Sequence, residues 1–124
     1  MGRQLRVAVI GGGIGGLTAA RALLRRGLDV HVYESSPELR EIGAGVALGP
    51  NAMKALRSLD LESAVRAIGY QAPFQNLRTW KGRMISKTDA TVAAQRFGAN
   101  GCTIHRADLL DVLAAALPPE LVSL

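Results

Sequence analysis

The sequence predicts an α/β fold that begins with a strand, a glycine turn, a helix and a second strand. The apolar run Val7–Ile10 leads directly into six residues, 11–16, of which five are glycine. An Ala/Leu-rich stretch with helical spacing follows, and the alternation of apolar residues over Asp29–Glu34 then indicates a strand. Strand, glycine turn, helix and strand in this order predict a Rossmann-like βαβ unit.

The glycine turn has the spacing G-x-G-x-x-G, in which each glycine has its own task. Gly11 allows a tight turn, Gly13 lets a pyrophosphate approach the backbone, and Gly16 lets the helix pack closely on the strand. The free N–H groups and the dipole of the helix N-terminus favour an anion there. Glu34 ends the second strand 18 residues after Gly16, where a carboxylate accepts hydrogen bonds from a ribose diol. The turn therefore predicts a site for an adenine dinucleotide, and a tight turn without a ligand is the alternative.

Length and composition indicate one globular domain at most. The chain has 124 residues, 48% of them hydrophobic and 20% charged. A doubly wound sheet needs more βα units than the two clear strands here provide. After Pro118-Pro119, residues 121–124 are expected to begin another buried strand. We therefore expect residues 1–124 to be the N-terminal part of a longer protein.

Charge and cysteine content exclude several classes of function. The net charge of +5 could suggest nucleic acid, but the basic residues are scattered among acidic ones or end the first helix, so nucleic-acid binding is not expected. Cys102 is the only cysteine, which excludes an intrachain disulfide and a thiolate metal site and fits the cytoplasm. No metal site is expected, and no apolar stretch is long enough to cross a membrane.

From the glycine turn to Gly69, the sequence predicts three helices and a glycine-rich stretch between the first and the second. The first helix is expected over Ile14 to Arg26, with Gly27 at its end. The glycine-rich stretch 43–49 indicates backbone lying against a ligand or another backbone, or an irregular crossover; the residues do not decide between these. Pro50 opens a helix, with Met53, Leu56 and Leu59 as its buried face. Asp60 is interpreted as the N-cap of a short helix that ends at Gly69.

The second half predicts a hairpin and a strand that leads into a helix. The hairpin turns at residues 81–83, and Trp80 beside it is interpreted as a packing residue. Residues 91–94 are strand or loop. Cys102–His105 forms a short strand that leads into a helix whose apolar positions include Leu109 and Leu113. Arg106, at this junction, either points its guanidinium at a phosphate or lies exposed. Both histidines are interpreted as structural.

Three segments together resemble a known family. Gly11–Gly16 with Glu34, Gly43–Ala52 and His105–Leu109 are similar to the N-terminal part of the single-component (class A) FAD-dependent aromatic hydroxylases. The most similar types are salicylate hydroxylase, 3-hydroxybenzoate 6-hydroxylase and 6-hydroxynicotinate 3-monooxygenase. The resemblance covers almost the whole chain. It implies a glutathione-reductase-type FAD-binding domain, incomplete here, with a small β-hairpin region.

The resemblance also implies an activity and a set of cofactor-binding residues. The full-length protein would be a monooxygenase that hydroxylates a small aromatic substrate with bound FAD, O2 and NAD(P)H as co-substrate. The fragment alone is expected to be inactive, and no side chain is expected to be catalytic. The 6-hydroxynicotinate enzymes carry a histidine where this sequence has Ala47, which makes that substrate less expected. The residues implied to bind the cofactor are Gly11, Gly13, Ile14, Gly15, Gly16, Glu34, Ser35, Val46, Ala47 and Arg106.

Two other functions remain open at the level of sequence. One is an NAD(P)-dependent dehydrogenase that uses the same glycine fingerprint, and the other is a non-enzymatic dinucleotide-binding module. The expected partners are a small aromatic substrate, the remainder of the same polypeptide and, in a homo-oligomer, further copies of it. Membrane association is not expected.

Overall fold

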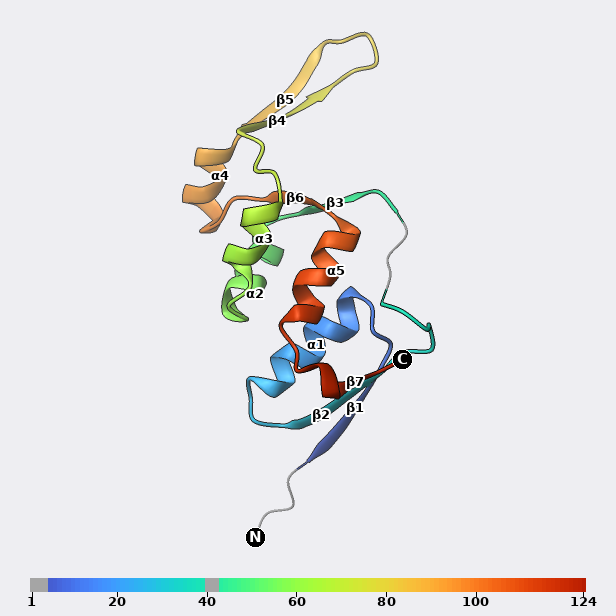
Figure 1. Ribbon diagram of the computed structural model, residues 1–124. Coiled ribbons are helices and arrows are strands. Elements are labelled where there is room, and N and C mark those ends of the chain that lie inside the picture. The colour runs from blue at the N-terminus through green and yellow to red at the C-terminus, as the bar shows by residue number, and fades with distance from the viewer. Residues whose placement is uncertain (1–4, 40–42) are drawn as a thin grey trace. The chain divides into compact units, whose positions relative to one another are not determined.

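A computed structural model describes residues 5–39 and 43–124, which form two compact units (Figure 1). The first unit comprises Met1–Ala44 and His105–Leu124, and the second comprises Gly45–Ile104. The predicted α/β class is confirmed, because helices alternate with short strands in both units.

The first unit holds a parallel sheet and two helices. Its sheet has the strand order β1 (Arg6–Ile10), β2 (Asp29–Tyr33) and β7 (Val122–Ser123), with Val7 opposite Val30 and Val32 opposite Val122. Helix α1 (Ile14–Leu24) crosses from β1 to β2. Helix α5 (Arg106–Ala115) packs on α1, and a 3-10 turn, Pro119–Leu121, precedes β7.

The core of the first unit follows the predicted alternation. Val30 and Val32 of β2 are buried, whereas His31 is half-buried and Tyr33 is exposed. The helices add leucines and an alanine with helical spacing. The other buried side chains of this unit are Leu17, Ala20, Leu109, Leu110, Leu113 and Leu117.

The second unit contains three helices and two small sheets. The helices are α2 (Pro50–Ser58), α3 (Glu62–Ile68) and α4 (Ala90–Phe97). Strands β3 (Gly45–Leu48) and β6 (Cys102–His105) form one sheet, and β4 (Phe74–Arg78) and β5 (Met84–Asp89) form the antiparallel hairpin that the sequence predicts. Its buried hydrophobic side chains are Met53, Leu56, Leu59, Leu61, Val65, Ala99, Cys102 and Ile104.

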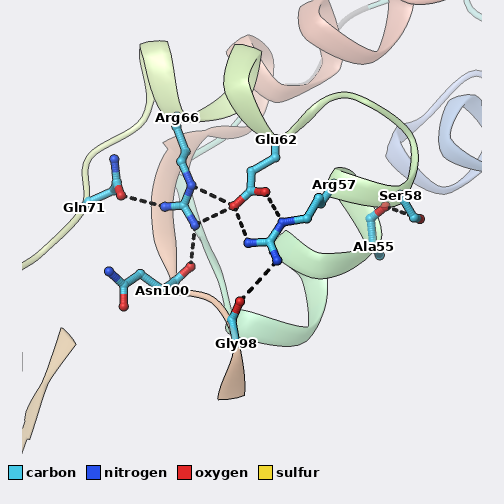
Figure 2. A network of polar contacts seen from close by, with 8 residues as sticks. All are labelled: Ala55, Arg57, Ser58, Glu62, Arg66, Gln71, Gly98 and Asn100. Carbon is cyan, nitrogen blue, oxygen red and sulfur yellow. Dashed lines mark hydrogen bonds and ion pairs between the residues drawn. The ribbon is translucent and has the colours of Figure 1, made fainter. Parts of the chain in front are cut away.

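A polar network ties the helices of the second unit to the segment before β6 (Figure 2). The Glu62 carboxylate accepts hydrogen bonds from Arg57 Nη2 at 3.1 Å and from Arg66 Nε at 2.9 Å. Arg57 also donates to the carbonyl of Gly98, and Arg66 to the carbonyl of Asn100. Hydrogen bonds from Arg57 and then Arg66 lower the pKa of Glu62 to about 2. Arg57, Glu62 and Arg66 therefore form a charged cluster that stabilises this unit; this cluster is called the brace.

The interpretation of Asp60 as an N-cap is wrong. Helix α3 starts at Glu62, and Asp60 instead has a left-handed backbone, with φ 59°. The Asp60 N–H donates to the carbonyl of Arg57, and the Leu61 N–H to that of Leu56. These two bonds form a Schellman motif that ends α2, a motif whose left-handed position aspartate tolerates.

Residues 91–94 were expected to be strand or loop, and both interpretations are wrong. These residues lie inside helix α4. The Asp89 side chain caps the helix by accepting from the Thr91 N–H at 2.7 Å. Gly98 ends it with φ 77°. These cap signals outweigh the weak helix propensity of Thr91 and Val92.

Trp80 is not a packing residue within the second unit. Its side chain is 91% exposed at the end of the hairpin, where the Lys81 ammonium lies 5.2 Å from the ring centre. Both hairpin strands are exposed along their whole length. The hairpin therefore buries no aromatic core of its own.

A candidate dinucleotide-binding site

The glycine turn brings β1 and α1 into close contact. Gly11 has φ 107°, which only glycine adopts readily, and its N–H donates to the Tyr33 carbonyl at 2.7 Å. A Cβ on Gly16 would lie 1.9 Å from the Gly11 carbonyl oxygen. The helix can start this close to the strand only because Gly16 has no side chain.

The N-terminus of α1 is open. Gly13 is the N-cap residue, and no side chain caps its end among the described residues. A Cβ on Gly15 would meet no atom within 4 Å, and Ile14 is half-buried as the first helical residue. Because no described side chain caps this helix, its first-turn N–H groups are candidate donors to an anion.

The Glu34 carboxylate lies beside this turn and is held by the main chain. The Gly12 N–H donates to Glu34 Oε2 at 2.6 Å, and the Ser36 N–H donates to Oε1 at 2.8 Å. The Ser35 hydroxyl adds a longer bond to Oε1, at 3.3 Å. The N–H groups of Ser36 and then Gly12 lower the pKa of Glu34, so the carboxyl stays ionised at neutral pH.

A cavity of about 130 Å³ opens next to Glu34. Ligand pockets usually enclose about 300–1,000 Å³, so this one would take only part of a dinucleotide, such as a ribose. Its walls combine carboxylates, glycine backbone and two leucines. The lining residues are Gly12, Gly13, Glu34, Ser36, Glu38, Leu39 and Leu110.

The remaining residues of the predicted site lie in both units. Arg106 is the exposed first residue of α5, and its Cδ lies 3.9 Å from the point where a Cβ on Gly43 would be. Val46 and Ala47 belong to β3 in the second unit. Ala47 lines a separate cavity of about 220 Å³ there, together with Tyr70. The first unit thus brings the glycine turn and Glu34 together, whereas Val46 and Ala47 belong to the second unit.

The glycines of the stretch 43–49 lie partly against protein backbone. A Cβ on Gly45 would be 3.5 Å from the carbonyl of Ile104 in β6, the strand that pairs with β3. Of the readings that the sequence left open, proximity to another backbone accounts for Gly45.

Three further observations concern metal-ligating side chains, the cysteine and the helices. No group of three or more metal-ligating side chains occurs in residues 5–39 and 43–124. Burial raises the pKa of the Cys102 thiol, which keeps it protonated. Among the described helices, none has both the length and the apolar character that a membrane span requires.

Sequence reasoning missed the two main-chain donors to Glu34. Gly12 occupies a variable position of the fingerprint, and Ser36 lies in the break after β2. The Ser-Ser-Pro turn directly after a terminal acidic residue could have indicated a hydrogen-bonded bend there.

A parallel βαβ unit with a glycine turn and a carboxylate at the end of its second strand defines a dinucleotide-binding protein. Comparison with known proteins narrows this class. Residues 4–118 match the family described as FAD binding domain, and the chain belongs to that family.

Similar proteins of known activity include two bacterial monooxygenases. The chain is 36% identical to the 6-hydroxynicotinate 3-monooxygenase of Pseudomonas fluorescens, covering 99% of the chain and 32% of that protein. It is 39% identical to the salicylate hydroxylase of Pseudomonas putida, covering 92% and 26%. The chain therefore spans about a third or less of the length of these relatives.

Solved structures of the same kind have the same fold. HpxO of Klebsiella pneumoniae, complexed with FAD and uric acid, matches with a TM-score of 0.82 and 28% identity over 96% of this chain and 30% of that one. The tetrameric form of 2-methyl-3-hydroxypyridine-5-carboxylic acid oxygenase matches with a TM-score of 0.82 and 31% identity, over 98% and 32%. The predicted FAD-binding type of fold and the predicted family are thus confirmed.

Proposed function

We propose that this chain is the N-terminal part of the FAD-binding domain of a monooxygenase that hydroxylates a small aromatic substrate with NAD(P)H and O2. The observation that carries the proposal is the glycine turn beside an ionised, main-chain-held Glu34, in a member of the FAD binding domain family. The activities of the similar proteins support the substrate class.

The residues of the first unit fit the adenosine diphosphate half of FAD. The open space at Gly15 leaves room for a pyrophosphate at the start of α1, and the close approach at Gly16 sets the helix at that position. Glu34 faces a cavity of the size of a sugar and offers carboxylate oxygens to its hydroxyl groups. Ile14 and Ser35 flank these contacts, and Arg106 would complete the site with a guanidinium.

The bound flavin would supply the redox and oxygen chemistry. The residues of this chain would bind and orient it: the helix N-terminus would hold the phosphates and Glu34 the ribose, and Val46 and Ala47 of β3 are the proposed contacts of the flavin ring. Ala47 has no titratable group, so it cannot act as a base toward the substrate. We accordingly propose an aromatic substrate other than 6-hydroxynicotinate.

The proposal also covers the protein's assembly. The remainder of the polypeptide would complete the FAD domain and supply most of the substrate site. We propose that the full-length protein forms a homo-oligomer in the cytoplasm. One similar oxygenase has a tetrameric form, which supports this.

The test is the cofactor content of the full-length protein. It is expected to purify with a flavin absorption spectrum, or to regain one when FAD is added to the apoprotein, and to oxidise NAD(P)H faster when an aromatic substrate is present. Absence of flavin binding would refute the proposal. Nicotinamide binding without flavin would favour a dehydrogenase, and dinucleotide binding without turnover would favour a binding module.

A further inference from the structure

The Glu34 carboxylate has a fixed set of donors that leaves part of its hydrogen-bonding capacity free. A carboxylate has about four lone-pair sites on its two oxygens. Two of them are taken by the Gly12 and Ser36 N–H groups, at 2.6 and 2.8 Å, one on each oxygen. Among the described residues, the Ser35 hydroxyl, at 3.3 Å, is a further and longer contact.

The two main-chain donors come from two different turns, one before and one after Glu34 in the sequence. Gly12 belongs to the glycine turn, where a Cβ would lie 3.1 Å from Glu34 Cβ, so its backbone is packed against the Glu34 side chain. Ser36 belongs to the turn that follows β2. Since neither donor can rotate as a hydroxyl can, together they set both the position and the plane of the carboxylate.

We propose that Ser36, through its main-chain N–H, is a positioning residue for ribose recognition in this site. It acts through Glu34: the Ser36 N–H holds Oε1, the Gly12 N–H holds Oε2, and the carboxylate held in this way lines the cavity. The inference rests on the proposed function, because the ligand is the ribose of FAD. The Ser35 hydroxyl is a weaker, displaceable donor that yields its place to the ligand.

A proline at position 36 tests this role. Ser36→Pro removes the N–H, and because Ser36 already precedes Pro37, its backbone favours the extended region that proline also adopts. In the full-length apoprotein, the Kd for FAD is expected to rise about tenfold, the effect of losing one hydrogen bond to a charged group. Ser36→Ala keeps the N–H and is the matched control, expected to bind FAD several-fold more tightly than Ser36→Pro.

The pH dependence of FAD binding separates positioning from general damage. The Ser36 N–H is the largest cause of the lowered Glu34 pKa, so its removal raises that pKa. The acidic limb of FAD binding is then expected to move to higher pH in Ser36→Pro and not in Ser36→Ala. Glu38 is the other carboxyl that lines the cavity, and Glu38→Gln measures its share of the same limb.

A second variant covers the case in which Ser36→Pro does not fold. Glu34→Asp keeps the charge but is one methylene shorter, so its carboxylate cannot reach both N–H groups; FAD binding is expected to weaken about tenfold here too. Where Ser36→Pro does fold, a double variant completes the test: in a Glu34→Gln background, Ser36→Pro is expected to raise the Kd for FAD less than about twofold further.

Two results would overturn the inference. If wild type and Ser36→Pro have the same Kd for FAD and the same pH profile, Ser36 is not a positioning residue. The proposed function would not be affected by that result. Failure of the wild-type protein to bind FAD would refute the proposed function and the inference with it.

Discussion

The two units each hold a glutamate with a lowered pKa, and the two are held in different ways. Glu34 in the first unit receives two main-chain N–H groups and one hydroxyl. Glu62 in the second unit receives two guanidiniums, from Arg57 and Arg66, which themselves bind backbone carbonyls (Figure 2). Glu34 lines a cavity, whereas Glu62 lines neither cavity described here.

The difference shows that a lowered carboxyl pKa does not by itself identify a binding site. The arginines around Glu62 neutralise its charge and fill its lone pairs, which leaves a structural brace. The N–H groups on Glu34 fix its position without neutralising it, and they leave acceptor capacity free. We therefore expect substitutions at Glu34 to change ligand affinity and substitutions at Glu62 to change stability.

The largest expected effect is that of Gly16→Ala, which breaks the turn that presents Gly12 to Glu34. The added Cβ would lie 1.9 Å from the Gly11 carbonyl oxygen, so α1 must move away from β1. The loss of stability is expected to be about 3 kcal/mol or more. Urea denaturation and the flavin content of the full-length protein measure it, and a fully folded, flavin-bound Gly16→Ala protein would contradict this account.

The next largest effect is that of Glu62→Ala in the brace. Two guanidiniums lose their shared carboxylate, and the expected loss of stability is about 2 kcal/mol, since the Arg57 side chain is 53% exposed and partly screened. Urea denaturation checks this value. FAD affinity is expected to change less than about twofold; a larger change would mean that Glu62 affects the site.

Glu34→Gln is the counterpart in the site. The amide keeps the size of the side chain but replaces one acceptor oxygen with a donor, which opposes either the Gly12 or the Ser36 N–H. FAD affinity of the apoprotein is expected to fall about tenfold. Fluorescence titration with FAD measures the affinity, and an unchanged Kd would remove Glu34 from the site.

The pH dependence of stability is a further test of the role of Glu62. The Glu62 pKa is about 2 in the fold against an ordinary value of 4.5, so its contribution to stability is complete above pH 4.5 and is lost as the pH falls toward 2. The stability difference between wild type and Glu62→Gln is therefore expected to shrink by roughly 1 kcal/mol between pH 5 and pH 3. A difference that stays constant over this range would show that the ion pairs contribute nothing.

The sequence predicted the first unit better than the second. The glycine spacing, the helix ending at Gly27 and the alternation of β2 are local patterns, and each has its counterpart in the structure. Gly27 has φ 75°, and its N–H donates to the Leu24 carbonyl. The donors to Glu34 were missed because they are main-chain N–H groups, for which the Ser-Ser-Pro turn after Glu34 is only an indirect signal.

Errors in the second unit arose where two signals compete. Asp60 is a good N-cap residue and also a tolerated left-handed residue, and the end of α2 decided between these roles. Thr91 and Val92 favour strands, yet the Asp89 cap and Gly98 enclose them in a helix. Trp80 was expected to pack because aromatic side chains usually do, but both strands of its hairpin are exposed, which no local pattern indicates.

The smallest expected effect is that of Gly15→Ala, one residue from the position with the largest. Its Cβ would meet no protein atom within 4 Å, and alanine favours a helix over glycine, so stability is expected to rise by about 0.5 kcal/mol. The same methyl group would enter the space that we assign to the pyrophosphate, so FAD affinity is expected to fall about threefold. Thermal denaturation of the apoprotein and FAD titration separate the two effects. A loss of stability would contradict the open space at Gly15, and a gain in both stability and affinity would place the phosphates elsewhere along the turn.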